Sequence, residues 1–308
     1  MHIKIGTRGS KLALWQAQYV AELLKKGGAK PELVIIETKG DKIQNKALSK
    51  IGSKGVFTEE LEEQLREKKI DIAVHSAKDV QSSLADDLSL IAFSKREQVN
   101  DVVISFNGAA RLDTFNSSYI IGTSSTRRIA QLKHYYPKIR TADVRGNLQT
   151  RLKKLEKGSY DALILAYAGV HRMGYHDYIV ETLSIDKFTP AVGQGCIAIE
   201  AAQNLDTEKR SLIRQCINDE PTEKCLRAER AFLRTLEGGC SIPVFGLATL
   251  QNEQITLNGG IISLGGEKLV KEHTSGHFQE AEELGKQLAQ NILQSGGGKI
   301  LDEIKANL

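Results

Sequence analysis

The chain repeats one order of predicted elements, and this repetition constrains its fold more than any other feature. Residues 3–20 (IKIGTRGSKLALWQAQYV) and 119–137 (YIIGTSSTRRIAQLKHYYP) both predict a strand, a Gly-Thr turn and a helix. Residues 57–79 and 148–169 both predict an amphipathic helix, a basic linker and a buried strand. The two pairs are offset by about 116 and about 90 residues. Two copies of one plan predict two α/β lobes across a cleft, although unrelated α/β chains also repeat these elements.

A third region with a different pattern begins near residue 218. Residues 218–239 predict a helix with Pro221 in its first turn and a Gly-Gly pair at its end. Three short strands separated by Asn and Gly turns follow, and a helix over 278–293 and a shorter one close the chain. A length of 308 residues suits two or three domains. We therefore predict a small C-terminal α+β domain with a three-stranded antiparallel sheet.

Composition indicates where the protein is expected to be located and which kinds of site it is expected to contain. The N-terminal segment MHIKIGTRGSK has no apolar signal core, and no apolar run approaches membrane-spanning length. We therefore expect a cytoplasmic protein without a membrane partner. The four cysteines (Cys196, Cys216, Cys225, Cys240) form no CxxC pair and no Cys/His metal spacing, which predicts free thiols and no metal site. The net charge of +4 is small, so strong anion binding requires local clustering of cations.

Basic and hydroxyl side chains cluster in the turns that follow the predicted strands. The turns GTRGS and GTSSTRR place small polar residues and backbone N–H groups at helix starts, where the helix dipole favours negative charge. Guanidinium groups suit bidentate binding of carboxylate or phosphate. The arginines in question are Arg8, Arg127, Arg128, Arg145, Arg151 and Arg172. The alternative for each arginine is a solvated surface position.

The segment VHSAKDV (74–80) leaves a buried strand and carries Lys78 and Asp79. Ligands of open α/β sheets bind beyond the carboxyl ends of the strands. A carboxylate beside a cation there stays ionised and can stabilise a positive charge that forms during a reaction. The alternative is an ordinary turn, and for His75 a packed strand histidine. Cys240, in EGGCSIP, lies in a glycine-flanked loop that can expose a thiol for alkylation, whereas the other cysteines read as buried.

These segments together resemble the porphobilinogen deaminase family over nearly the whole chain. The likeness is densest in TRGSKLALWQAQ, TKGDK, KIGSKGVFTEELE, DIAVHSAKD, IGTSSTRR, RGNLQTRL, AVGQGC and EGGC, taken in this order and spacing. The resemblance implies two lobes built like periplasmic solute-binding proteins. It further implies lobe 1 over 1–95 and 193–215, lobe 2 over 96–192, and a C-terminal domain over 218–308. It also implies a monomer.

The resemblance implies a reaction as well. Four porphobilinogens are joined head to tail with release of ammonia, giving hydroxymethylbilane on a dipyrromethane cofactor. Cys240 would hold the cofactor as a thioether, and Asp79 would be the catalytic acid group. Cofactor-binding residues would be Ser76, Lys78, Thr123, Ser125, Arg127, Arg128, Arg145 and Gln194. Substrate-binding residues would be Arg8, Ser10, Arg151 and Arg172, with Lys50, Lys54 and Phe57 on a flexible active-site loop over 42–57.

Three positions depart from the family pattern without removing a charged or nucleophilic group. Gln81 stands where proline is common, Ser53 where glycine is usual, and Thr126 where leucine usually precedes the paired arginines. Two other interpretations remain open. One is a non-enzymatic solute-binding or sensor protein for a small dicarboxylate. The other is nucleic-acid binding, against which stand the mild charge surplus and the lack of interleaved aromatic residues.

Overall fold

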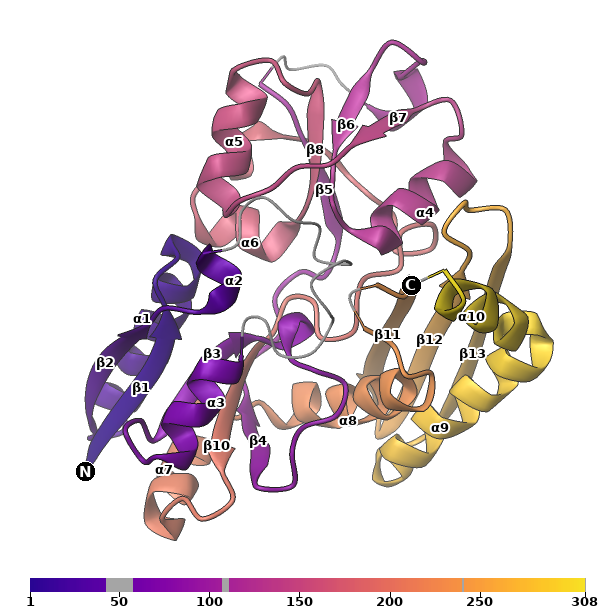
Figure 1. Cartoon of the computed structure of the whole chain (residues 1–308). Helices are drawn as coiled ribbons and strands as arrows, with labels where there is room; N and C mark the ends of the chain where they lie inside the picture. The colour runs from indigo at the N-terminus through magenta and orange to yellow at the C-terminus, as the bar shows by residue number, and fades with distance from the viewer. Residues whose placement is uncertain (43–57, 107–110, 240, 308) are drawn as a thin grey trace.

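The computed structural model describes residues 1–42, 58–106, 111–239 and 241–307. Two α/β lobes lie one above the other in Figure 1, and a smaller C-terminal domain lies beside them. Lobe 1 is built on a sheet of order β2-β1-β3-β10-β4. Its strands are β1 (His2–Arg8), β2 (Lys30–Ile36), β3 (Ile72–Ser76), β4 (Leu88–Phe93) and β10 (Ile197–Ala202). Because β2 and β3 both run parallel to β1, the carboxyl ends of these three strands share one edge.

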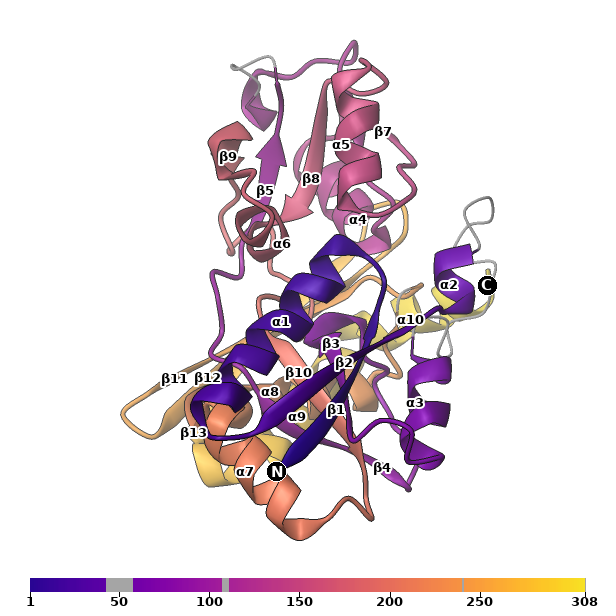
Figure 2. The same ribbon diagram turned by 90° about the vertical axis from the view of Figure 1, so that its left-hand side faces the viewer.

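Helices cover both faces of the lobe 1 sheet. On one face, α1 (Lys11–Lys26) packs with α7 (Thr207–Ile217), and on the other lies α3 (Glu59–Arg66) (Figure 2). The helix α1 begins where it does because the Ser10 hydroxyl accepts a hydrogen bond from the Ala13 N–H at 3.3 Å. Its apolar positions then recur on the side that faces the sheet.

Lobe 2 repeats the plan of lobe 1 strand for strand. Its sheet has the order β7-β6-β8-β5-β9, with β7 and β8 parallel to β6 and with β5 antiparallel to both β8 and β9. In lobe 1, β10 takes the place of β5. The strands are β5 (Asp101–Ile104), β6 (Ile120–Gly122), β7 (Arg140–Ala142), β8 (Ala162–Ala166) and β9 (Ile179–Thr182). Core packing places α4 (Thr126–Tyr135) on one face and α5 (Leu148–Glu156) with α6 (Tyr167–Arg172) on the other. The predicted duplication is confirmed.

Two crossing segments connect the lobes. Residues 94–100 lead from β4 into β5, and residues 183–196 return from β9 into β10. The returning segment needs glycine at position 193. Its φ is +77°, and a Cβ there would lie 2.9 Å from the backbone of Ala77 and Lys78. The crossing therefore packs directly against the turn that follows β3.

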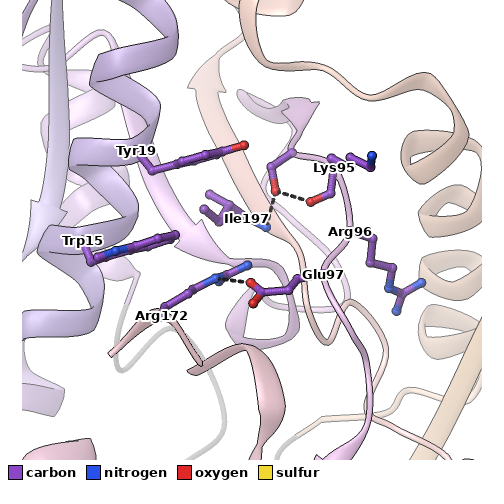
Figure 3. A pocket seen from close by; sticks show the side chains of 8 residues that line it. Trp15, Tyr19, Lys95, Arg96, Glu97, Arg172 and Ile197 are labelled. Atoms are coloured by element: carbon purple, nitrogen blue, oxygen red, sulfur yellow. Dashed lines mark hydrogen bonds and ion pairs between the residues drawn. The ribbon is translucent and has the colours of Figure 1, made fainter. Parts of the chain in front are cut away.

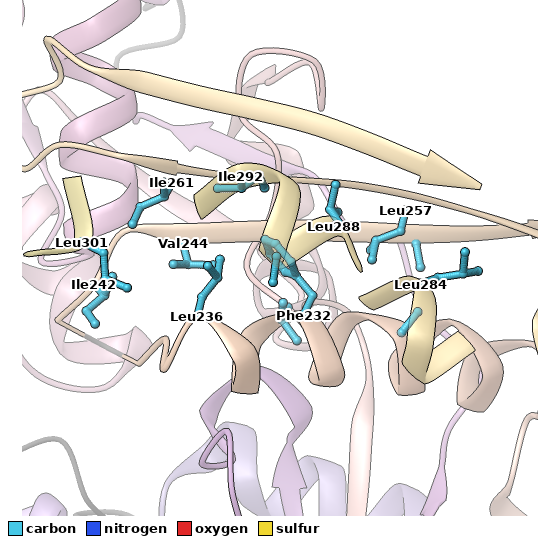
Figure 4. Packing of buried hydrophobic residues seen from close by; sticks show 14 of the residues in the cluster. Phe232, Leu236, Ile242, Val244, Leu257, Ile261, Leu284, Leu288, Ile292 and Leu301 are labelled. Atoms are coloured by element: carbon cyan, nitrogen blue, oxygen red, sulfur yellow. The ribbon is translucent and has the colours of Figure 1, made fainter. Parts of the chain in front are cut away.

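The C-terminal domain is a three-stranded antiparallel sheet covered by helices. Its elements are α8 (Glu220–Thr235), β11 (Val244–Gln251), β12 (Gln254–Ile262), β13 (Leu269–His277), α9 (Ala281–Ile292) and α10 (Gly298–Lys305). Phe232 of α8 is fully buried among Leu257, Leu288 and their neighbours, as Figure 4 shows. The Asp219 side chain caps α8 by accepting from the Thr222 N–H at 3.1 Å. The predicted α+β domain is confirmed.

The observed elements differ from the prediction in a few places. The first strand continues to Arg8 rather than ending at Ile5, because its pairing with β2 extends to the Arg8–Ile36 pair. Residues Lys39–Lys42 form a short helix, α2, which ends at the first residue of the loop predicted over 42–57. No helix among the described residues is both long and apolar enough to cross a membrane.

Candidate active site between the lobes

The turn that follows β3 carries the predicted acid. Ala77–Asp79 form a single 3-10 turn at the carboxyl end of β3, where Asp79 is exposed and Lys78 is half-buried. A cavity of about 70 Å³ lies beside Asp79. It is lined by Arg8, Ser10, Leu12, Ala13, Gln16, Thr58, Val74, His75, Ser76 and Asp79. The parallel arrangement of β1 and β3 therefore brings Arg8 and Ser10 to the same cavity as Asp79.

Arg127 and Arg128 lie at the start of α4 in lobe 2, and both are buried. Their side chains share one carboxylate: Asp101 accepts from Arg127 Nη2 at 2.8 Å and from Arg128 Nη2 at 2.7 Å. Gln194 Nε2 donates to the same carboxylate at 2.8 Å. Burial alone would raise the pKa of Asp101, but the two guanidinium groups hold it well below its usual range. The pair is thus fixed in place by an ionised, fully buried acid.

Cations of the two lobes lie close enough to repel one another. Burial, together with the nearby Arg128, lowers the pKa of Lys78 to about 8, although Asp79 opposes the change. Burial also lowers the pKa of Arg151, again with a contribution from Arg128 and with Asp79 opposing. Lys78 and Asp79 of lobe 1 therefore share one electrostatic environment with Arg128 and Arg151 of lobe 2. This environment carries an excess of positive charge that anions would relieve.

Two further predicted arginines of lobe 2, Arg145 and Arg151, are each held through Nε. Arg145 Nε donates to Asp143 Oδ2 at 2.9 Å, and Arg151 Nε donates to the Gly146 carbonyl at 2.8 Å. Ser124 in turn donates to both Asp143 and the Val144 carbonyl. The two arginine bonds are donated by Nε, whereas the two Nη nitrogens form the end of each guanidinium group. The arrangement suits end-on binding of a carboxylate.

The predicted hydroxyl residues make hydrogen bonds that hold the local structure. Ser76 accepts from Gln16 Nε2 at 2.9 Å. Thr123 accepts from the Ser125 N–H at 3.3 Å, and Ser125 caps α4 by accepting from the Arg128 N–H at 3.4 Å. His75 is buried and lies 3.0 Å from the Glu200 carboxylate, in agreement with a packed strand histidine.

Some predicted residues lie elsewhere. Arg172 is the last residue of α6, and its side chain contacts Glu97 and Gly195 in the two crossing segments. Cys240, Lys50, Lys54, Phe57 and Ser53 lie outside the described residues. The Gln81 side chain, in the position that departs from the family pattern, donates to Thr58 and Glu62, each at 3.3 Å. The turn after Asp79 is therefore tied to the start of α3.

Sequence reasoning missed Asp101, which orients both paired arginines. Its signal is present in the segment DVVI (101–104), where a carboxylate opens an otherwise apolar strand. A charged residue in a fully buried strand requires a partner of opposite charge. The arginine pair of the next helix is a natural candidate for that partner. Glu97, which binds Arg172, was also missed, and no local pattern marks it.

Comparisons with known proteins cover almost all of the chain. A family model described as porphobilinogen deaminase, dipyromethane cofactor binding domain, matches residues 3–210, and the C-terminal domain model of the same family matches 223–294. A relative from Cytophaga hutchinsonii named porphobilinogen deaminase is 55% identical over 99% of this chain and 98% of its own. A relative of the same name from Desulfosudis oleivorans is 50% identical over the same shares. This chain belongs to the porphobilinogen deaminase family. The family consists of transferases of tetrapyrrole biosynthesis, so a non-enzymatic solute-binding protein is not favoured.

The chain is also distantly similar to solved structures that share little sequence with it. The periplasmic VFT2 domain of Bordetella pertussis BvgS has a TM-score of 0.43 and 17% identity, and covers 70% of this chain and 86% of its own. The methionine binding protein MetQ has a TM-score of 0.44 and 13% identity, and covers 70% of this chain and 89% of its own.

The site residues fit the dipyrromethane cofactor of the family. Among the described residues, Arg128 Nε and Gln194 Oε1 are buried polar atoms without a hydrogen-bond partner. Together with the crowded cations of the cleft, Arg128 Nε is suited to a ligand that brings carboxylates. The described thiols are poorly suited to attachment. Burial raises the pKa of Cys196 to about 12 and that of Cys225 to about 11, so that little thiolate forms near neutral pH.

Proposed function

We propose that this chain condenses four porphobilinogens head to tail, releases ammonia at each addition and yields hydroxymethylbilane. The observation that carries the proposal is the shared environment of Lys78 and Asp79 with Arg128 and Arg151. A site with an excess of cations beside the exposed carboxylate of Asp79 suits a substrate that carries two carboxylates and becomes positively charged when ammonia leaves. The dipyrromethane, when bound, supplies the pyrrole to which the substrate units are added.

Asp79 is proposed to stabilise the substrate as its amine departs. Loss of ammonia leaves a positive charge on the pyrrole and its methylene carbon. A carboxylate about 4 Å from that charge contributes roughly 4 kcal/mol of Coulomb energy at an effective dielectric constant of 20, before desolvation. Part of this energy is gained only as the charge forms, which is the condition for a faster chemical step. The exposed position of Asp79 leaves it accessible to substrate.

The arginines are proposed to bind carboxylate side chains of the cofactor and of the growing oligopyrrole. Because Arg127 is held by Asp101, Gln131 and the Thr189 carbonyl, its proposed part is to add fixed positive charge and to keep the Asp101 carboxylate in position. Arg128, Arg145 and Arg151 offer guanidinium groups with some N–H donors that make no hydrogen bond to the described residues. The proposed cofactor and substrate contacts are those of Ser76, Lys78, Thr123, Ser125, Arg128, Arg145, Gln194, Arg8, Ser10 and Arg151, and the family pattern adds Cys240, Lys50, Lys54 and Phe57.

We also propose domain limits of 1–95 with 193–215, 96–192 and 218–308. A monomeric state and a cytoplasmic location complete the proposal.

The direct test is release of ammonia from porphobilinogen by the purified holoenzyme. Asp79→Ala removes the carboxylate, and we expect turnover to fall by at least about 100-fold, since the charged transition state loses its partner. Asp86→Ala is the matched control, because Asp86 is an exposed carboxylate seven residues further along the same loop. Near-normal turnover in Asp79→Ala, with retained cofactor, would remove Asp79 from the mechanism. Wild-type holoenzyme without ammonia release would contradict the proposed activity itself.

A further inference from the structure

The end of α6 is tied to both crossing segments by one arginine and one glutamate. Arg172 Nε donates to Glu97 Oε2 at 2.8 Å, and Arg172 Nη2 donates to the Gly195 carbonyl at 3.0 Å. His171 Nδ1 lies 2.7 Å from the other Glu97 oxygen. Glu97 belongs to the segment that leaves lobe 1, and Gly195 to the one that returns. We name Glu97, Arg172 and Gly195 the crossing clamp.

The crossing clamp also reaches lobe 1 through an aromatic contact. The Arg172 guanidinium carbon lies 5.4 Å from the ring centroid of Trp15 on α1. The Trp15 ring stacks on Tyr19, with centroids 5.6 Å apart and planes 3° apart. Figure 3 shows the two rings and the guanidinium stacked one above another, with Glu97 beside the guanidinium. The Arg172 side chain is 6% exposed, although a cavity of about 250 Å³ adjoins it. One side chain of lobe 2 thus touches lobe 1 and both crossings.

The backbones of the two crossing segments are in close contact at the crossing clamp. The Glu97 N–H donates to the Gly195 carbonyl at 3.1 Å, the same oxygen that Arg172 binds. Gly195 has a φ of +87°, and a Cβ there would lie 2.5 Å from the Glu97 carbonyl oxygen. The two crossings are therefore in direct contact where the clamp closes over them. Arg172 directs two of its donors to the protein at this point.

The position of the clamp bears on the reaction because the reacting groups are divided between the lobes. Asp79 lies in lobe 1, whereas Arg128 and Arg151 lie in lobe 2. A change in the angle between the lobes would move the acid relative to the carboxylates that the arginines hold. Misplacement of a reacting group by about 1 Å can cost about 100-fold in rate.

We propose that Glu97 is a positioning residue of this enzyme, and that it holds Arg172 so that the two lobes keep the relative orientation the reaction requires. Arg172 then acts on catalysis through the crossing clamp. The inference rests on the proposed function for its kinetic consequence only. Binding of substrate carboxylates remains with Arg8, Arg128, Arg145 and Arg151, so the clamp affects the chemical step more than the affinity.

The test compares Glu97→Ala, Arg172→Leu and the double variant as purified holoenzymes. We expect kcat to fall about tenfold in each, with KM for porphobilinogen changed by less than about twofold. The double variant should be no worse than either single one, because each change breaks the same link. Glu97→Gln keeps acceptor oxygens for Arg172 and should recover part of the lost kcat. Asp113→Asn is the control, since its ion pair with Arg111 is exposed and involves no residue of the clamp.

Hydrogen exchange provides a readout that does not depend on activity. The Glu97 N–H and the Tyr167 N–H, which donates to the Asn100 carbonyl at 3.0 Å, should exchange faster in Glu97→Ala than in wild type. Amides of β12 in the C-terminal domain should be unchanged. A large rise in KM in Arg172→Leu, with Glu97→Ala like wild type, would overturn the proposal and place Arg172 on the substrate. If wild-type holoenzyme does not turn over porphobilinogen, the proposed function fails. The hydrogen-exchange measurement still tests the crossing clamp in that case.

Discussion

Replacement of Asp101 by asparagine tests how the paired arginines are held. The Asp101 carboxylate is fully buried and accepts from Arg127, Arg128 and Gln194 at 2.7–2.8 Å. Asn keeps the shape of the side chain but removes the negative charge and turns one acceptor into a donor. Two buried guanidinium groups then lose their counter-charge. Removal of one partner from a buried ion pair costs about 3–5 kcal/mol.

This cost is a large part of the whole stability of the protein. Folded domains are stable by about 5–15 kcal/mol, so a loss near 4 kcal/mol is severe without abolishing folding. With a urea m-value of about 3 kcal/mol/M, the upper end of the usual range, the unfolding midpoint should fall by about 1.3 M. Circular dichroism during urea titration measures this midpoint. Asp113→Asn should leave it unchanged, because the Arg111–Asp113 pair is exposed and 3.7 Å long.

The pH dependence of the same difference follows from the lowered pKa of Asp101. Its stabilising contribution is complete above the pKa of an unfolded aspartate, about 3.9, and is lost only as the pH falls through the lower folded value. The gap between wild type and Asp101→Asn should therefore be the same at pH 7 and pH 5. A midpoint shift below about 0.3 M at both pH values would refute the reasoning, because that is a cost of less than about 1 kcal/mol.

Three further outcomes follow from the structure. Lys78, with its pKa near 8, loses its charge as the pH rises, so KM for porphobilinogen should increase above pH 8, and steady-state assays of Lys78→Arg should show a flatter profile. Ser125→Ala removes the cap of α4 and should cost about 1 kcal/mol in urea unfolding, with Ser125→Thr as the conservative control. Phe232→Ala leaves a cavity in the C-terminal core and should cost about 3–5 kcal/mol; a cost below 1 kcal/mol would mean that the core collapses around the gap.

Much of the fold could be predicted because its signals are local. The strand–turn–helix pattern of residues 3–20 and its later copy correspond to β1–α1 and β6–α4. The Ser10 cap of α1 and the Gly-Gly pair that follows α8 are local signals too. The pairing of β10 between β3 and β4 is different, because no periodicity in residues 197–202 says which sheet they join. Short strands such as β7 offer too few residues for a pattern to emerge.

The candidate site was predictable in its charges and less so in its contacts. Lys78, Asp79, Arg128 and Arg151 could be singled out because they follow strand ends or begin helices, and the structure brings them together. Glu97, the acid that holds Arg172, could not be assigned, since the two residues are 75 positions apart in the chain and meet only through the fold. Of the two crossings on which this contact depends, the returning one is marked in the sequence by Pro190, Gly193 and Gly195, whereas residues 94–100 carry no such signal.

The intact mass of the purified protein tests the central claim most directly. Protein made in cells that synthesise porphobilinogen should weigh more than its sequence by two condensed pyrrole units. Cys240→Ser should lose that excess, whereas Cys216→Ser should keep it. An unmodified wild-type mass, or an excess that persists in Cys240→Ser, would contradict a dipyrromethane carried on Cys240.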